Sequence, residues 1–110
     1  MKVLVFESNL MWSSKLAQTL RGFGHEPVLL SNAAEIPCGA QAAIINLGQP
    51  TPDPAELSAK LKAAGVPVIA HAGHKEKELM ELGRSLNVDV LTTNSELTNK
   101  LPDILASLQQ

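Results

Sequence analysis

Two histidines and one glutamate are the side chains of this sequence with the most evident capacity for chemistry. His71 and His74 lie three positions apart, and with Glu7 they could supply nitrogen and oxygen ligands to a metal ion. The spacing is weak support, because such histidines more often lie at the surface or cap a helix. Ser8 or Ser95 could act as a nucleophile with a histidine and an acid, but neither lies in a Gly-x-Ser-x-Gly turn. We therefore expect no enzymatic activity, no resident metal and no cofactor.

Short apolar runs predict the strands that would position these side chains. Each run is continuous rather than alternating, which is typical of strands covered on both faces of a parallel sheet. Loops are expected to begin at Asn46 and to span residues 71–74. The predicted strands are residues 3–6, 28–30, 42–45, 66–70 and 88–91.

Helical signals separate these runs. Ser8 or Asn9 can cap a first helix that ends near residues 22–24. The clearest helix start is Asp53, which is followed by a proline at the first helical position and by Glu56 three residues later.

Three further segments are less regular. Residues 31–41 contain too little periodic apolar surface for a long helix, so a short helical turn plus a loop is expected there. Leucines at helical spacing predict a helix over residues 79–86. The last segment has the same spacing, but Pro102 would break an earlier helix, so we expect the main helix to begin near that residue.

Strands that alternate with helices predict one doubly wound α/β domain over residues 1–110, with a parallel sheet and helices on both faces. In such sheets, ligands bind beyond the carboxyl ends of the strands. The residues expected at that edge are Glu7, Ser8, Asn9, Asn46, His71, Ala72, Gly73, His74, Thr92, Thr93 and Asn94.

Several stretches resemble the receiver domain of bacterial two-component response regulators, and the likeness covers nearly the whole chain. Residues 2–9 look like the first strand and acidic turn of that family, and residues 22–26 look like the turn into its second strand. Residues 46–50 are similar to its third-strand end, where the phosphoacceptor aspartate lies four residues before a proline, and residues 66–70 match its fourth strand. The resemblance implies a CheY-like, flavodoxin-like fold with three α/β/α layers and strand order 2-1-3-4-5.

The same resemblance implies where a phosphorylation site would lie. The family holds magnesium with two adjacent acids after the first strand, positions that Glu7 and Ser8 occupy here. Its aspartate nucleophile maps to Asn46, and its hydroxyl residue after the fourth strand maps to Ala72. Its lysine after the fifth strand maps to Asn94.

Most of this chemistry is replaced. Among the mapped positions only Glu7 keeps the family's residue type, and this remains so if a one-residue shift moves the lysine position to Thr93. The switch aromatic maps to Leu91. The neutral amide of Asn46 cannot act as the nucleophile, and one carboxylate beside an amide is a poor magnesium site. The resemblance therefore predicts a divergent pseudo-receiver that lacks the phosphorylation residues.

The composition narrows the partners. A net charge of -2 and three aromatic residues argue against nucleic-acid binding. No apolar run approaches the roughly 18 residues that a membrane span requires. Hydrophobic residues make up 45% of the chain, which is enough for one core. The single cysteine, Cys38, is compatible with a reducing compartment. We expect a cytoplasmic domain.

The leading hypothesis is a phosphorylation-independent pseudo-receiver that acts as a protein-interaction module in bacterial signal transduction. The expected interaction face combines the helix near residues 79–86, the fifth strand and the last helix, and the partner is another protein or a second copy of the chain. The alternative is a small-molecule or metal-binding sensor that uses a pocket edged by Glu7, Asn46, His71 and His74.

Overall fold

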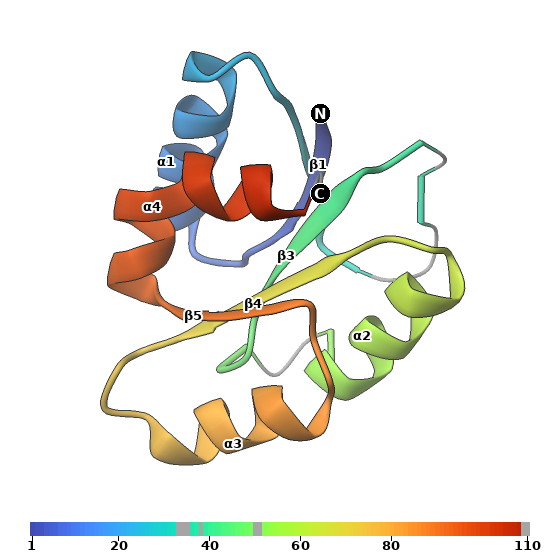
Figure 1. The fold of residues 1–110 in the computed structure, drawn as a ribbon, viewed down its shortest axis with the longest axis vertical. Coiled ribbons are helices and arrows are strands. Elements are labelled where there is room, and N and C mark those ends of the chain that lie inside the picture. The colour runs from blue at the N-terminus through green and yellow to red at the C-terminus, as the bar shows by residue number, and fades with distance from the viewer. Residues whose placement is uncertain (33–35, 38, 50–51, 109–110) are drawn as a thin grey trace.

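The structure, a computed structural model, has a twisted sheet of five parallel strands at its centre (Figure 1). It describes residues 1–32, 36–37, 39–49 and 52–108. The strands occur in the order β2-β1-β3-β4-β5, as predicted. Their bounds are β1 Lys2–Phe6, β2 Glu26–Leu29, β3 Ala42–Asn46, β4 Val68–Ala72 and β5 Val90–Thr93.

Helices cover both faces of the sheet and complete the three predicted layers (Figure 1). Their bounds are α1 Leu10–Gly22, α2 Pro54–Ala63, α3 Lys77–Ser85 and α4 Asn94–Ser107. Side chains alternate along each strand, so β1 contributes Val3 and Val5 to the core under α1 and α4, and Leu4 and Phe6 to the core under α2 and α3. The predicted doubly wound α/β class is therefore confirmed.

Two predicted caps position helices next to the carboxyl edge of the sheet. The side chain of Asn9 accepts a hydrogen bond from the backbone N–H of Trp12 at 3.1 Å, which starts α1 directly after β1. Asp53 accepts one from the N–H of Glu56 at 3.2 Å and is followed by Pro54 in the first helical turn of α2. These contacts satisfy backbone donors that have no partner inside a helix.

The predicted bounds of the fourth and fifth strands are wrong, and the error matters for the site. β4 begins at Val68, and its pairing with β3 brings Asn46 level with His71. His71 and Ala72 therefore belong to the strand and not to the predicted loop over residues 71–74. β5 is likewise shifted toward the C-terminus, to Val90–Thr93, because Thr93 pairs with Ala72. Interstrand pairing decided these ends, whereas the prediction relied on apolar runs alone.

Other predicted bounds also need correction. Between β2 and β3 the described residues form no helix, while residues 33–35 and Cys38 lie outside the described part of the chain. β2 spans Glu26–Leu29 and not residues 28–30. α4 begins at Asn94, well before Pro102, and accommodates the proline through a non-helical Lys100 (φ −121°, ψ 19°). The predicted break is therefore present as a kink at Lys100, where two helical segments meet, but helical structure also precedes the kink from Asn94 onward.

In the described part of the chain, no helix is both long and apolar enough to cross a membrane.

One side-chain contact at the amino edge of the sheet is open to a direct test. The carboxylate of Asp89 accepts a hydrogen bond from the N–H of Val68 at 2.7 Å, which joins the segment before β5 to the first residue of β4. Asp89→Ala should lower the free energy of unfolding by about 1 kcal/mol, measured by urea denaturation. Asp89→Asn keeps an acceptor oxygen and should lose less. Equal losses in the two variants would contradict a role for this hydrogen bond.

Candidate functional site

Three polar side chains extend the core face under α1 and α4 to the carboxyl edge of the sheet. Glu7, Asn46 and His71 each lie two positions beyond a buried aliphatic residue of that core on the same strand. Because strand side chains alternate, all three point to that same face. The β3–β4 pairing places Asn46 beside His71, and the β1–β3 pairing brings the end of β1 alongside. Residues that are distant in sequence thus meet at one edge.

Glu7 is the centre of this group. Its side chain is only 1% exposed. The amide Nδ2 of Asn46 donates to Oε2 at 2.9 Å and to Oε1 at 3.3 Å, and the backbone N–H of Asn9 donates to Oε1 at 3.1 Å. The Nε2 atom of His71 lies 3.4 Å from Oε2. The buried carboxylate thereby accepts hydrogen bonds from Asn46 and Asn9 and has the imidazole of His71 beside it.

The orientation of the Asn46 amide follows from its two neighbours. Its Oδ1 accepts a hydrogen bond from the backbone N–H of Gly48 at 2.9 Å, while its Nδ2 faces Glu7. A flipped amide would place an oxygen against the carboxylate and a nitrogen against an N–H, so only the observed orientation satisfies both contacts. Both ends of Asn46 are therefore engaged.

His71 bridges Glu7 to the start of α4. Its side chain is 1% exposed, and its Nδ1 lies 2.6 Å from Oδ1 of Asn94. Its Nε2 makes no hydrogen bond of ordinary geometry and has the Glu7 carboxylate as its polar neighbour. The ring also packs near the indole of Trp12, with 6.2 Å between ring centroids. An imidazole that carries a hydrogen on both nitrogens can donate both to Oδ1 of Asn94 and to Oε2 of Glu7, whereas a neutral imidazole has a hydrogen on one nitrogen only.

Opposing effects act on the pKa of the Glu7 carboxyl. Burial raises it, because the charged form loses its hydration. The contacts with His71, the N–H of Asn9 and the amide of Asn46 lower it, and the charge of His71 adds to them. The net result is a pKa below the ordinary value for glutamate. The environment thus holds Glu7 as a carboxylate.

Among the other positions that the resemblance maps to the phosphorylation site, only Asn94 contacts the Glu7–Asn46–His71 group. Ser8 is exposed, and its backbone N–H donates to Oε1 of Gln49 at 2.9 Å. Ala72 is 2% exposed and packs in the apolar core under α2 and α3. Thr93 caps α4 and accepts a hydrogen bond from the N–H of Glu96 at 3.2 Å.

A magnesium ion of the kind that the resemblance implies does not suit these residues. Magnesium requires several oxygen ligands in octahedral geometry. Here Asn46 turns its nitrogen, not its oxygen, toward Glu7, and the other neighbours of the carboxylate are the ring of His71 and the N–H of Asn9, none of which is an oxygen ligand. The donor set is that of a carboxylate stabilised by N–H groups.

The predicted four-residue pocket is only partly assembled. Glu7, Asn46 and His71 are in contact, but His74 is exposed in the turn after β4, and among the described residues no hydrogen bond or ion pair joins it to the other three. No group of three histidine, cysteine, aspartate or glutamate side chains within the described ranges could hold a metal ion. The sensor hypothesis stays a prediction.

Two contacts of this site were missed from the sequence. The pairing of His71 with Asn94 and the packing of Trp12 against the imidazole both depend on His71 lying inside β4. The usable signal was the residue order Ile-Ala-His-Ala after Val68, in which a strand that continues for two more positions buries the histidine.

The comparison with solved structures agrees with this architecture. A receiver domain protein from Clostridium thermocellum has a TM-score of 0.81 at 16% identity, with 97% of this chain and 92% of that chain covered. A two-component response regulator from Clostridium difficile reaches a TM-score of 0.82 at 13% identity, covering 99% and 95%. The Francisella response regulator 1452 receiver domain has a TM-score of 0.73 at 17% identity, covering 99% and 98%.

The chain has the receiver fold. No family model and no curated protein matches the sequence. At these identities the likeness concerns the arrangement of helices and strands. In this receiver fold the carboxyl edge contains the Glu7–Asn46–His71–Asn94 network, and Ala72 stands at the end of β4.

The effects of substituting Glu7 and His71 on stability should be coupled to each other. His71→Gln leaves the buried Glu7 carboxylate without the imidazole beside it and should lower the free energy of unfolding by about 3 kcal/mol. Adding Glu7→Gln removes the stranded charge, so the double variant should be more stable than the sum of the single effects implies, by at least about 1 kcal/mol. Urea denaturation of the four proteins measures this coupling. Strictly additive losses would contradict the pairing.

The lowered pKa of Glu7 predicts a pH dependence of stability. In the unfolded chain the carboxyl titrates near its ordinary value of about 4.3, and in the folded chain it titrates lower. Its contribution is therefore fully present above the ordinary value and is lost as the pH falls through the lower, folded value. The stability difference between the wild type and Glu7→Gln should be constant near neutrality and shrink below about pH 4. A difference that stays constant down to pH 2.5 (roughly the end of the carboxylate range) would contradict the assignment.

Proposed function

We propose that this chain is a phosphorylation-independent pseudo-receiver that acts as a protein-interaction module in bacterial signal transduction. One observation carries the proposal: the phosphoacceptor position holds an asparagine whose amide is already hydrogen bonded at both ends, to Glu7 and to Gly48.

Formation of an aspartyl phosphate requires a carboxylate oxygen that attacks phosphorus. The amide of Asn46 is neutral, and its lone pairs are weakly nucleophilic because they are delocalised over the amide group. Its Oδ1 accepts from Gly48 and its Nδ2 donates to Glu7, so neither atom is presented to an incoming phosphoryl group. Glu7 itself is only 1% exposed and cannot replace the missing nucleophile at the surface.

The groups that would stabilise a transferred phosphoryl group are also replaced. Ala72 has no hydroxyl and is buried in an apolar core, and Asn94 offers a neutral amide whose oxygen faces His71. Phosphoryl transfer needs preorganised positive charge or hydrogen-bond donors at the oxygens where negative charge develops. The site instead stabilises one resident carboxylate.

The fold supports an interaction role. Two of the solved structures to which the chain is similar are described as response regulators, and a third as a response regulator receiver domain protein, which places their fold in signalling proteins. The residues described here do not combine a nucleophile, a base and an oxyanion donor, so an enzymatic role has no assembled site. A well-packed scaffold with its phosphorylation chemistry replaced is suited to recognition of other proteins.

Incubation with magnesium and acetyl phosphate, followed by intact-mass measurement, tests the proposal. The expected result is no gain of mass, because position 46 lacks a carboxylate nucleophile. An active receiver domain treated in parallel shows that the reagent works. Asn46→Asp serves as the matched variant and should also remain unmodified, since Ala72 has no hydroxyl and Asn94 carries no positive charge. A stable gain of one phosphate by the wild type, on residue 46 or its neighbours, would overturn the proposal.

A further inference from the structure

Large apolar side chains remain exposed in one region of the surface. Among the described residues, the exposed large apolar side chains are Leu10 (83%), Met11 (84%), Phe23 (57%) and Leu29 (51%). All four belong to α1, its C-cap or β2, and the face formed by α3, β5 and α4 contributes none of them. Exposed apolar residues thus gather away from the interaction face that the sequence suggested.

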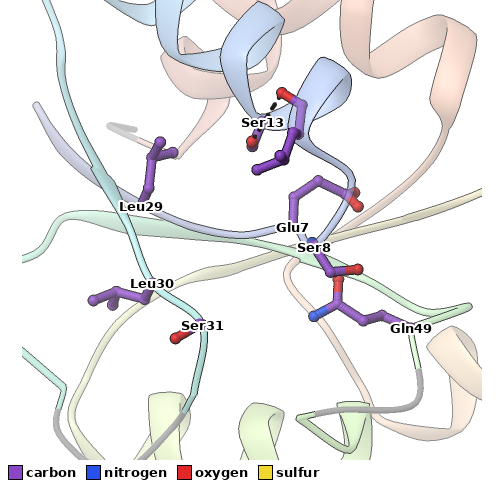
Figure 2. Close-up of a pocket in the computed structure, with 8 residues that line it drawn as sticks. Glu7, Ser8, Ser13, Leu29, Leu30, Ser31 and Gln49 are labelled. Carbon is purple, nitrogen blue, oxygen red and sulfur yellow. Dashed lines mark hydrogen bonds between the residues drawn. The ribbon is translucent and has the colours of Figure 1, made fainter.

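Two of these residues line a pocket at the carboxyl edge of the sheet, and a third is next to it in the chain. Leu10, Leu29 and the half-buried Leu30 line a pocket of about 360 Å³, and Met11 is the next residue of α1. Figure 2 shows Leu29, Leu30 and Ser31 along the end of β2, across the pocket from Glu7, Ser8 and Gln49. We call Leu10, Met11, Leu29, Leu30 and the pocket between them the α1/β2 patch. It contains both protruding apolar side chains and a cavity that could receive one.

Folding of the single chain does not explain Leu10 and Met11. They occupy the first two positions of α1, where the partial positive charge of a helix N-terminus favours aspartate or glutamate. The first turn of α1 contains no acidic residue, although Asn9 caps it well. Apolar side chains that are more than four-fifths exposed contribute little to the core but stabilise a complex once they are covered. Their placement points to association.

The lack of accessible charge at the α1/β2 patch indicates which kind of partner it can bind. The pocket is lined by serines, by Gln49 and by leucines, and its single charged residue, Glu7, has its carboxylate buried and paired. Lys15, one turn further along α1, lies over the Trp12 ring at 5.8 Å. Two identical patches can therefore meet without like charges facing each other. A strongly charged partner would find no opposite charge at the centre.

We propose that the α1/β2 patch is the interface of a symmetric homodimer, in which Met11 of one copy enters the pocket beside Leu29 of the other. A two-fold axis requires a surface that complements itself, and this patch offers a projection and a cavity side by side. Its apolar centre and uncharged hydroxyl and amide rim have the anatomy of a protein interface. The inference rests on the proposed interaction role and names the partner as a second copy of this chain.

Sedimentation equilibrium of the full chain over a range of concentrations tests the dimer. The wild type should show a reversible monomer–dimer equilibrium with a dissociation constant in the micromolar range, as for small interfaces. Met11→Glu should weaken the dimer at least tenfold, because it places a carboxylate in the apolar centre. Its melting temperature at low concentration should not fall, since an acid suits this helix position. Phe23→Ser removes an exposed apolar residue from the far end of α1 and should leave the dimer unchanged.

A mixing experiment tests the cross-copy contact. Met11→Lys and Leu29→Glu should each dimerise poorly alone. Mixed in equal amounts, they should form a heterodimer in which one original Met11–Leu29 contact remains and a lysine faces a glutamate at the other. Recovery of dimer in the mixture to within about threefold of the wild-type dissociation constant is the expected result.

Several outcomes would overturn the homodimer. A wild-type chain that stays monomeric up to about 1 mM would do so, since weaker contacts do not count as specific. Equal weakening by Phe23→Ser and Met11→Glu, or no recovery in the mixture, would also do so. A monomeric chain that binds a different protein through Met11 and Leu29 would refute the homodimer but leave the interaction role intact, whereas a monomer that binds only a small molecule there would count against both. Phosphorylation by acetyl phosphate would refute the phosphorylation-independent role and leave the dimer standing.

Discussion

A carboxylate that is removed from water must be surrounded by hydrogen-bond donors or by positive charge, and this requirement organises the carboxyl edge of the sheet. Glu7 meets it through the amide of Asn46, the N–H of Asn9 and the ring of His71. His71 in turn reaches Asn94 at the start of α4. One buried charge therefore ties together the ends of three neighbouring strands and the beginnings of two helices.

The same network bears on the proposal that this chain works without phosphoryl transfer. At the position that the resemblance maps to the phosphoacceptor, the amide of Asn46 donates to the Glu7 carboxylate, and the ring of His71 lies beside the same carboxylate. A fold places side chains at its edges but does not dictate their chemistry. The carboxyl edge, with its paired polar side chains, lies beside the α1/β2 patch, an arrangement that accords with the proposed interaction role.

The two features differ in how they relate to stability. Glu7, Asn46 and His71 are engaged with one another, so their residue types serve the folded chain itself. Leu10 and Met11 lie at exposed helix positions that acidic residues would suit better. A surface that departs from what local stability favours is where selection for association is expected to act.

Sequence patterns alone determined the number of strands, their alternation with helices and the cap at Asp53, because apolar periodicity and capping chemistry are local properties of the chain. They left the first cap open between Ser8 and Asn9, and the structure has Asn9. The resemblance to receiver domains added the strand order and the mapped positions. Tertiary structure alone decided that β4 continues through Ala72, since strand ends depend on pairing with a neighbour that is distant in sequence. That extension buried His71 against Glu7, and it separated His71 from His74. Likewise, only the assembled sheet brought the end of β2 alongside the start of α1 and left Leu10, Met11 and Leu29 uncovered, because exposure is a property of the packed molecule and not of any single segment.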